Sequence, residues 1–142
     1  MTGPVLGLDL GARRIGLALS DDAGKIAFPA GYLDRSGLEK DLSALVALIE
    51  QRGVTRVAVG LPLHLDGGIS VGAQAARQFA DALARACNRP VELVDERLTT
   101  AEAQRALQGA PRSRRRKRKQ VIDSMAATLL LRTYLQQRET GP

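Results

Sequence analysis

The chain has 142 residues and a formal net charge of +6, a length that suits one domain with its own hydrophobic core. Aromatic residues make up only 3%, which disfavours recognition of single strands by stacking bases on aromatic rings. No stretch has the roughly 20 apolar residues of a membrane span, and the single cysteine, Cys87, suits a reducing compartment. We therefore expect a cytoplasmic protein of one domain, residues 1–142, with Cys87 in its core.

The first third of the chain has the pattern of β-strands. Residues Pro4–Leu10 (PVLGLDL) form a short apolar run that suits a buried central strand, and Arg14–Ser20 (RIGLALS) alternates large apolar residues with small ones. The three residues between these runs are few enough for a hairpin turn. A third strand is expected near Lys25–Leu33, where Pro29 indicates a sheet edge.

The pattern then changes to helical spacing. Apolar residues from Leu38 to Ile49 mark one face of a helix, and Ser36 followed by Glu39 predicts a capping box at its start. Arg56–Leu61 (RVAVGL) predicts a buried strand. The next segment, Pro62–Gly72, is rich in glycine and predicts a loop.

The second half continues the alternation of helix and strand. A helix is expected from Ala73 to about Asn88, a fifth strand at Val91–Asp95 (VELVD), a short helix from Thr99 to Gly109, and a last helix at about Gln120–Gln137. This order, βββαβαβαα, predicts an α/β fold in which parallel strands follow an antiparallel start. Helices should cover both faces of the sheet.

Most of the positive charge lies in one run, RSRRRKRK, at residues 112–119. Without the seven basic residues of this run the formal net charge would be −1, so basicity is a local property. We expect a solvated loop that contacts the phosphate backbone of nucleic acid, with solubility as the alternative. The predicted phosphate contacts in the run are Arg112, Arg114, Arg115, Arg116, Lys117, Arg118 and Lys119.

Three acidic positions are candidates for chemistry. Asp9 lies in an apolar run, where a buried charge needs compensation; the alternative is that it caps the following turn. Asp95 and Glu96 close the fifth strand, and strand ends in open α/β sheets are where sites assemble. Asp123 is expected in the first turn of the last helix, where it could also serve as a favourable helix-terminal charge. Ala126, Ala127 and Leu130 share its helix face, and small residues three and four positions on favour a helix close to the sheet with the acid directed at the strand ends.

Carboxylates converging from two strands and a helix would form an oxygen-ligand site for Mg²⁺ or Mn²⁺. Two such ions can hydrolyse phosphodiester bonds without a side-chain base. This is relevant because the single histidine, His64, falls in a predicted loop, where we expect simple exposure, with substrate contact as the alternative.

Four segments together resemble the YqgF/RuvX family. They are GLDLGARRIGLALSD (Gly7–Asp21), VGLPLHLDG (Val59–Gly67), DERLTT (Asp95–Thr100) and KQVIDSMAATLLLRTYL (Lys119–Leu135). The resemblance implies a ribonuclease H-like fold with a five-stranded mixed sheet in the order 3-2-1-4-5. It also implies a nuclease, since family members are identified as Holliday junction resolvases or as nucleases that mature the precursor of 16S rRNA.

The resemblance places the family's three acids on Asp9, the DER segment and Asp123. Within DER we choose Glu96, with Asp95 as competitor. Alternation sends the two side chains to opposite sides of a strand, so only one of them can face the site easily, and the sequence alone does not fix which. His64 and Gly68 depart from the family's usual Asn and hydroxyl residue, which puts substrate contacts by that loop in doubt.

Further basic residues flank these acids. Arg13, Arg14 and Arg97 could each hold a phosphate through a planar guanidinium, and the alternative is surface salt bridging. Thr99 and Thr100 are expected to cap a helix. A homodimer would suit a branched DNA substrate, although nothing in the sequence demonstrates one.

Two other functions compete with a nuclease. One is ATP handling of the actin and sugar-kinase type, which needs two such domains where this length suits one. The other is a catalytically silent nucleic-acid-binding module.

Overall fold

The computed structural model describes the backbone of residues 3–61, 71–95 and 115–140, and the side chains of residues 3–61, 72–95 and 124–138. The strands are β1 (Val5–Leu10), β2 (Arg14–Ser20), β3 (Ala27–Asp34), β4 (Arg56–Leu61) and β5 (Val91–Asp95). The helices are α1 (Leu38–Arg52), α2 (Val71–Cys87) and α4 (Arg115–Thr140). The short helix expected at residues 99–109 lies outside the described residues. No helix in the described ranges is long and apolar enough to cross a membrane.

The five strands form one mixed sheet in the order β3-β2-β1-β4-β5. Strands β1, β2 and β3 pair antiparallel, whereas β4 pairs parallel with both β1 and β5. The carboxyl ends of β1, β4 and β5 therefore lie at the same end of the sheet. The expected strand order and the edge position of Pro29 are confirmed.

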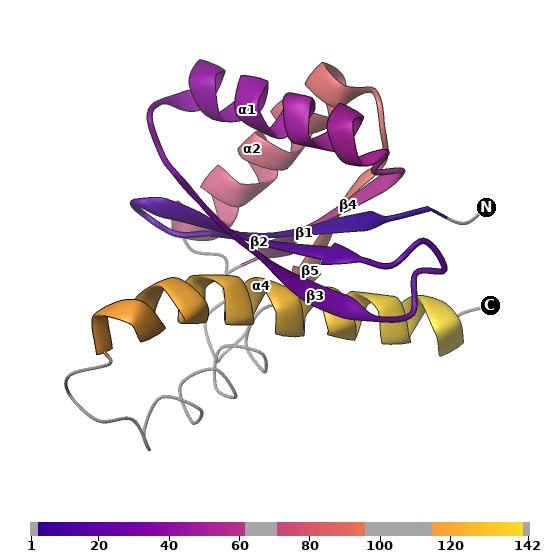
Figure 1. Cartoon of the computed structure of the whole chain (residues 1–142). Helices are drawn as coiled ribbons and strands as arrows, with labels where there is room; N and C mark the ends of the chain where they lie inside the picture. Colours follow the sequence, from indigo (N-terminus) through magenta and orange to yellow (C-terminus); the bar gives the residue numbers. More distant parts are fainter. Residues whose placement is uncertain (1–2, 62–70, 96–114, 141–142) are drawn as a thin grey trace.

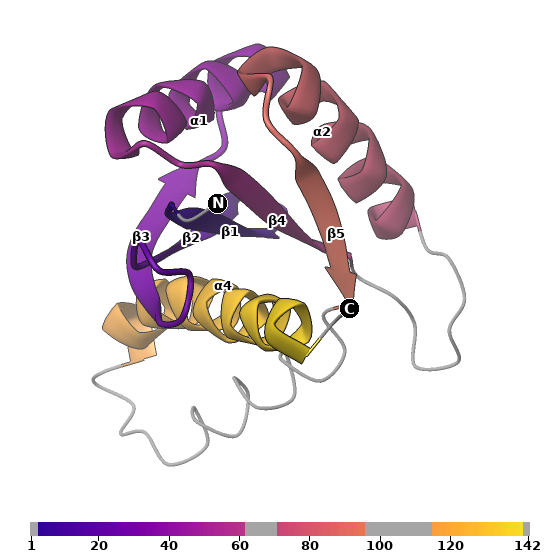
Figure 2. The same ribbon diagram turned by 90° about the vertical axis from the view of Figure 1, so that its right-hand side faces the viewer.

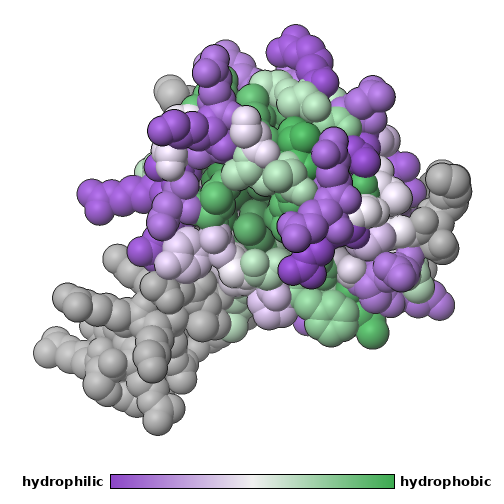
Figure 3. Space-filling view, turned by 45° about the horizontal axis from the view of Figure 1, so that its top comes forward, coloured by the Kyte–Doolittle hydropathy of each residue, from purple (hydrophilic) through white to green (hydrophobic). Residues whose placement is uncertain are grey.

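Helices cover both faces of the sheet, as predicted. Helices α1 and α2 lie on one face and α4 on the other (Figures 1 and 2). The core under α1 and α2 contains large aliphatic side chains such as Leu6, Leu8, Val57 and Val59, together with the buried Cys87. On this face, apolar side chains are visible between hydrophilic ones (Figure 3).

On the face under α4, the strands present smaller residues. Helix α4 contributes Ala127, Leu130, Leu131, Tyr134 and Leu135 at helical spacing. The strands oppose them with Val5, Ala18, Ala58 and Val94. At Gly7 the helix approaches so closely that an added Cβ would lie 2.9 Å from the Cβ of Leu131 and 3.2 Å from the carbonyl oxygen of Ala127. Only glycine permits this distance between β1 and α4.

The structure corrects the start of α1. The expected capping box of Ser36 and Glu39 is wrong, because the N-cap is Gly37 and no side chain caps it. Instead the buried carboxylate of Asp41 accepts a hydrogen bond from the Ser36 amide at 2.9 Å. A carboxylate within the first turns of α1 thus accepts a hydrogen bond from the backbone N–H that precedes the helix.

The boundaries of β1 and β3 also differ slightly from expectation. Strand β1 begins at Val5 and not at Pro4. Strand β3 begins at Ala27 because the amides of Lys25 and Ile26 donate to the carboxylate of Asp21, at 2.8 and 3.0 Å, and not to another strand. These hydrogen bonds lower the pKa of Asp21.

The largest correction concerns the last helix. It begins at Arg115, so residues 115–119 of the basic run belong to α4 and not to a loop. Arginine and lysine are good helix formers, and each like-charge pair one turn apart costs only about 0.2–0.5 kcal/mol. Asp123 is consequently not in the first turn, so the helix-terminal charge considered for it does not apply.

Replacing Gly7 with alanine should push α4 slightly away from the sheet and destabilise the fold. The added methyl group meets the Leu131 side chain and the Ala127 backbone, and such overpacking costs about 1–3 kcal/mol. Urea unfolding followed by circular dichroism measures this loss. Gly72→Ala, at an exposed position in the first turn of α2, is the matched control and should not destabilise the protein. Equal stability of Gly7→Ala and wild type would contradict the tight contact.

Candidate functional site

Asp9 lies near the carboxyl end of β1, on the face covered by α4. Its neighbours Leu8 and Leu10 both pack toward α1 and α2, so alternation directs Asp9 to the opposite side, the side of Val5 and Gly7. The Asp9 side chain is partly buried. An acid at this position therefore faces the helix that carries Asp123.

The strands beside Asp9 place no side chain next to it on this face. Gly16 of β2 is the register partner of Asp9. On the other side, Gly60 directly follows Val59, the partner of Leu8 in β4. Because both neighbouring positions are glycines, space is left beside the Asp9 carboxylate for a bound ion or group.

Position 123 of α4 and Asp9 of β1 lie at about the same distance, in the same direction, from the contact between the two elements. Helix and strand run in opposite directions (Figure 1) and touch where Gly7 meets Ala127 and Leu131. From that contact, two residues along β1 advance about 6.6 Å to Asp9, and four residues back along α4 advance about 6 Å to position 123. The two acids thus come from neighbouring stretches of backbone.

Asp95, the competitor for the second acid, lies on the other side of the sheet. In β5, Val91 and Leu93 pack toward α1 and α2, whereas Val94 packs under α4. Glu92 also lies on the α4 side, where it pairs with Arg56 and Arg138. The exposed Asp95 therefore shares the side of Val91 and Leu93, opposite to that of Asp9.

Several predicted site residues lie outside the described residues. These are Glu96, Arg97, Arg112, Arg114, His64, Gly68, Thr99 and Thr100. The side chains of Asp123 and of the five basic residues of the run at positions 115–119 are not described either, although their backbone is helical. Among the side chains that the structure describes, no group of three or more His, Cys, Asp or Glu could hold a metal ion.

The two arginines that follow Asp9 differ in their surroundings. Arg13 is exposed. The Nε of Arg14 lies 3.5 Å from Asp34, and its guanidinium stacks 4.6 Å from the centre of the Tyr32 ring. Salt bridging, the alternative to phosphate contact, is thus present at Arg14.

Arg35 ties the turn after β1 to the helices, a role that the sequence did not suggest. Its side chain donates to the Gly11 carbonyl oxygen at 2.8 Å, and its amide donates to the Arg13 carbonyl oxygen at 2.9 Å. The same guanidinium pairs with the buried Asp41 at 3.6 Å and lies over the Phe79 ring of α2. Turn, α1 and α2 are thereby joined through one side chain near the candidate site.

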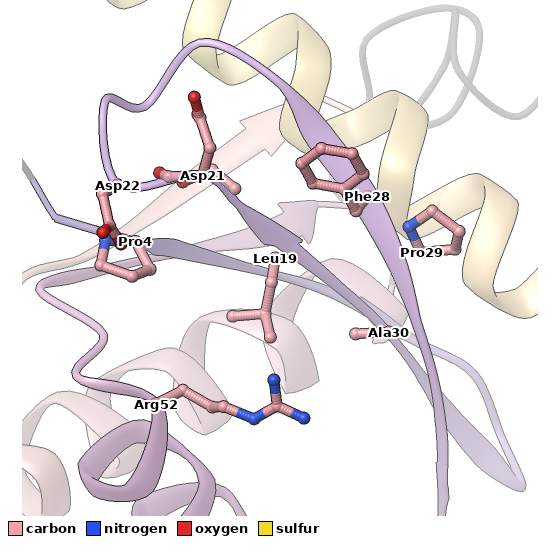
Figure 4. Close-up of a pocket in the computed structure, with 9 residues that line it drawn as sticks. Pro4, Leu19, Asp21, Asp22, Phe28, Pro29, Ala30 and Arg52 are labelled. Atoms are coloured by element: carbon pink, nitrogen blue, oxygen red, sulfur yellow. The ribbon is translucent and has the colours of Figure 1, made fainter.

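A cavity elsewhere in the molecule is not part of this arrangement. It measures about 420 Å³ and lies between Pro4, the end of β2, the start of β3 and Arg52 (Figure 4). This is the end of the sheet opposite to the carboxyl ends of β1, β4 and β5. Asp21 and Asp22 line this cavity, but no third His, Cys, Asp or Glu among the described residues joins them to form a group that could hold a metal ion.

Comparison with known proteins gives a consistent result. A family model described as "RuvX: Holliday junction resolvase" matches residues 3–137. A "Putative pre-16S rRNA nuclease" of Desulforudis audaxviator is 46% identical over 137 residues, 96% of each chain. A protein of the same description from Myxococcus xanthus is 45% identical over 130 residues, which cover 92% of this chain and 85% of its own.

Solved structures show the same fold at low sequence identity. "T. thermophilus RuvC in complex with Holliday junction substrate" has a TM-score of 0.59 and 16% identity, with 96% of each chain covered. A second structure, "Thermus thermophilus RuvC structure", has a TM-score of 0.57 and 13% identity, with 96% of this chain and 97% of its own covered. The ribonuclease H-like fold expected from the four segments is confirmed.

Removing the Arg35 side chain should destabilise the protein and loosen the turn after β1. Arg35→Ala leaves the buried Asp41 carboxylate without its ion partner and the Gly11 carbonyl without its donor, at a cost of about 1–3 kcal/mol. Urea unfolding measures this loss. Arg52→Ala, at the exposed end of α1, should change little, and an equal loss in both variants would contradict the role given to Arg35.

Proposed function

The chain belongs to the RuvX family of nucleases, and from this we propose that it is a divalent-metal-dependent nuclease whose ligands are Asp9, Glu96 and Asp123. The observation that carries the proposal is the placement of Asp9 between two glycines, opposite the α4 backbone at position 123. The match over residues 3–137 supports a single nuclease domain. We infer that it works in the cytoplasm, where its substrates would occur.

Glu96 is our choice for the second acid. Because Asp95 falls on the side of the sheet away from Asp9, the next residue would fall on the same side as Asp9 if the strand alternation continues. Three carboxylates suit Mg²⁺ or Mn²⁺, which prefer oxygen ligands. Two bound ions would supply an activated water and stabilise the leaving oxygen.

The protein itself would supply ligands, space and charge. Asp9 stands on a central strand, so it is held rigidly, and the glycines beside it leave room for a phosphate group. Residues 115–119 continue the same helix that carries Asp123. We propose that these basic residues, with Arg13, Arg97, Arg112 and Arg114, guide the nucleic-acid backbone toward the metals, while Arg14 does so only when it leaves Asp34.

The substrate we favour is the precursor of 16S rRNA. Relatives that are 46% and 45% identical over nearly the whole chain carry that activity in their descriptions. A four-way DNA junction is the second candidate, because the family model is described as a Holliday junction resolvase. A homodimer, which would present two sites to such a junction, stays a prediction.

Asp9→Asn should abolish cleavage and leave nucleic-acid binding intact, because the amide loses the charge that holds the metal while the basic residues remain. Purified protein with Mg²⁺ or Mn²⁺ is tested against structured precursor RNA, four-way DNA junctions and single-stranded DNA. Cleavage is followed on gels and binding by fluorescence anisotropy. Equal cleavage by wild type and Asp9→Asn would overturn the site, and binding without cleavage by wild type would indicate a catalytically silent module.

Two neighbouring substitutions serve as a matched pair in the same assay. Glu96→Gln should reduce cleavage as severely as Asp9→Asn, whereas Asp95→Asn should retain most of the activity. The opposite result would assign the ligand role to Asp95.

The basic run should set the salt dependence of binding. Replacing Arg115, Arg116, Lys117 and Arg118 with glutamine removes four phosphate contacts and should flatten the slope of log affinity against log salt by about 3–4 units for duplex DNA. Anisotropy titrations at several salt concentrations measure the slope. Replacing four exposed basic residues outside the run, Lys25, Lys40, Arg52 and Arg85, is the control, and an unchanged slope in the first variant would assign the run to solubility.

A further inference from the structure

Ser124 is a buried polar residue of α4, next to Asp123, and only 4% of it is exposed. Its hydroxyl donates to the Leu17 carbonyl oxygen of β2 at 3.1 Å. The same hydroxyl accepts a hydrogen bond from the Gly31 amide of β3 at 3.2 Å. One side chain of the helix therefore bonds to the backbones of two strands.

These two backbone groups belong to an irregularity in the sheet. Gly16 pairs with Tyr32 and Ala18 with Pro29, so that two β3 residues, Ala30 and Gly31, oppose the single residue Leu17. Such a bulge leaves backbone groups without their usual partners. Gly31 has a φ of 85°, which glycine adopts without strain. The Ser124 hydroxyl occupies this gap and satisfies both groups.

The bulge lies close to the candidate metal site. Leu17 is the register partner of Leu8, the residue before Asp9. A shift of α4 along its axis by one residue, about 1.5 Å, would take the hydroxyl away from both strands. Gly7 sets how closely the helix approaches β1, in contact with the Leu131 side chain and the Ala127 carbonyl oxygen. The two hydrogen bonds of Ser124 are directional, so they depend more steeply on the axial position of the helix than this packing contact does.

We propose that Ser124 is a positioning residue of the metal site, which holds α4 in the axial position and rotation that place Asp123 opposite Asp9. The inference rests on the proposed function, because it requires that both acids bind the same metal ions. Ser124 does not itself touch metal or substrate. Its hydroxyl acts through the helix backbone that it shares with Asp123.

The test is direct Mn²⁺ binding by the full-length protein, followed through the electron paramagnetic resonance signal of the free ion. Ser124→Ala removes both hydrogen bonds to the strands, and misplaced ligands should weaken Mn²⁺ binding by about tenfold or more. In cleavage assays, kcat should fall while the KM for nucleic acid stays unchanged, since the basic residues are intact.

A matched control comes from the same helix. The Thr133 hydroxyl donates to the Leu129 carbonyl oxygen within α4, at 3.0 Å, so Thr133→Ala removes a hydroxyl without touching the helix–sheet contact. Its Mn²⁺ affinity should equal that of wild type. Ser124→Cys, which keeps nearly the same volume but offers only a weak donor and acceptor, should weaken Mn²⁺ binding as Ser124→Ala does. Thermal melts followed by circular dichroism identify the temperature range in which each variant is folded.

The outcomes separate this inference from the proposed function. If Asp9→Asn loses Mn²⁺ while folded Ser124→Ala and Ser124→Cys bind it like wild type, the positioning role is overturned and the proposed site stands. If wild type and Asp9→Asn bind Mn²⁺ equally, the proposed site fails and the positioning role fails with it.

Discussion

The close packing of α4 against β1 at Gly7 is the contact on which the candidate site depends. Large aliphatic residues fill the opposite face of the sheet, under α1 and α2, and such side chains hold helices well away from strands. Under α4 the strands present Gly7, Ala18 and Ala58 instead. The side chains between sheet and helix are thus large under α1 and α2 and small under α4. Acids from a strand and a helix can come close only on the face under α4.

The length of α4 joins part of the basic run to Asp123 in one rigid element. The helix begins with five basic residues of the run, continues through Asp123 and Ser124, and ends beyond the buried Tyr134 and Leu135. A helix is stiff over this length, so the position of the basic residues relative to the acids follows from its docking on the sheet. Contacts with the nucleic-acid backbone and with metal ions would then depend on the same packing interactions.

Local patterns predicted much of this fold and failed where two local interactions compete or where a side chain reaches a distant part of the chain. The bounds of β2, β4 and β5 were predicted correctly because each combines a regular apolar pattern with clear flanking breaks. The start of α1 was predicted wrongly, because Ser36 and Glu39 satisfy the capping pattern but Asp41 makes the contact. Neither Arg35 nor Ser124 carries a sequence signal, since each is defined by partners far away in the chain.

The sequence by itself determined the α/β class, the strand order through the four family segments, and the proposal of Asp9 and Asp123 as metal ligands, because an acid in an apolar run and a set of motifs are visible without coordinates. Tertiary structure alone decided that Asp95 lies on the side of the sheet away from Asp9, and that the Ser124 hydroxyl of α4 bonds to two strands at a β-bulge. These features depend on strand register and on contacts between residues as much as 107 positions apart, and periodicity within one segment carries no information about either.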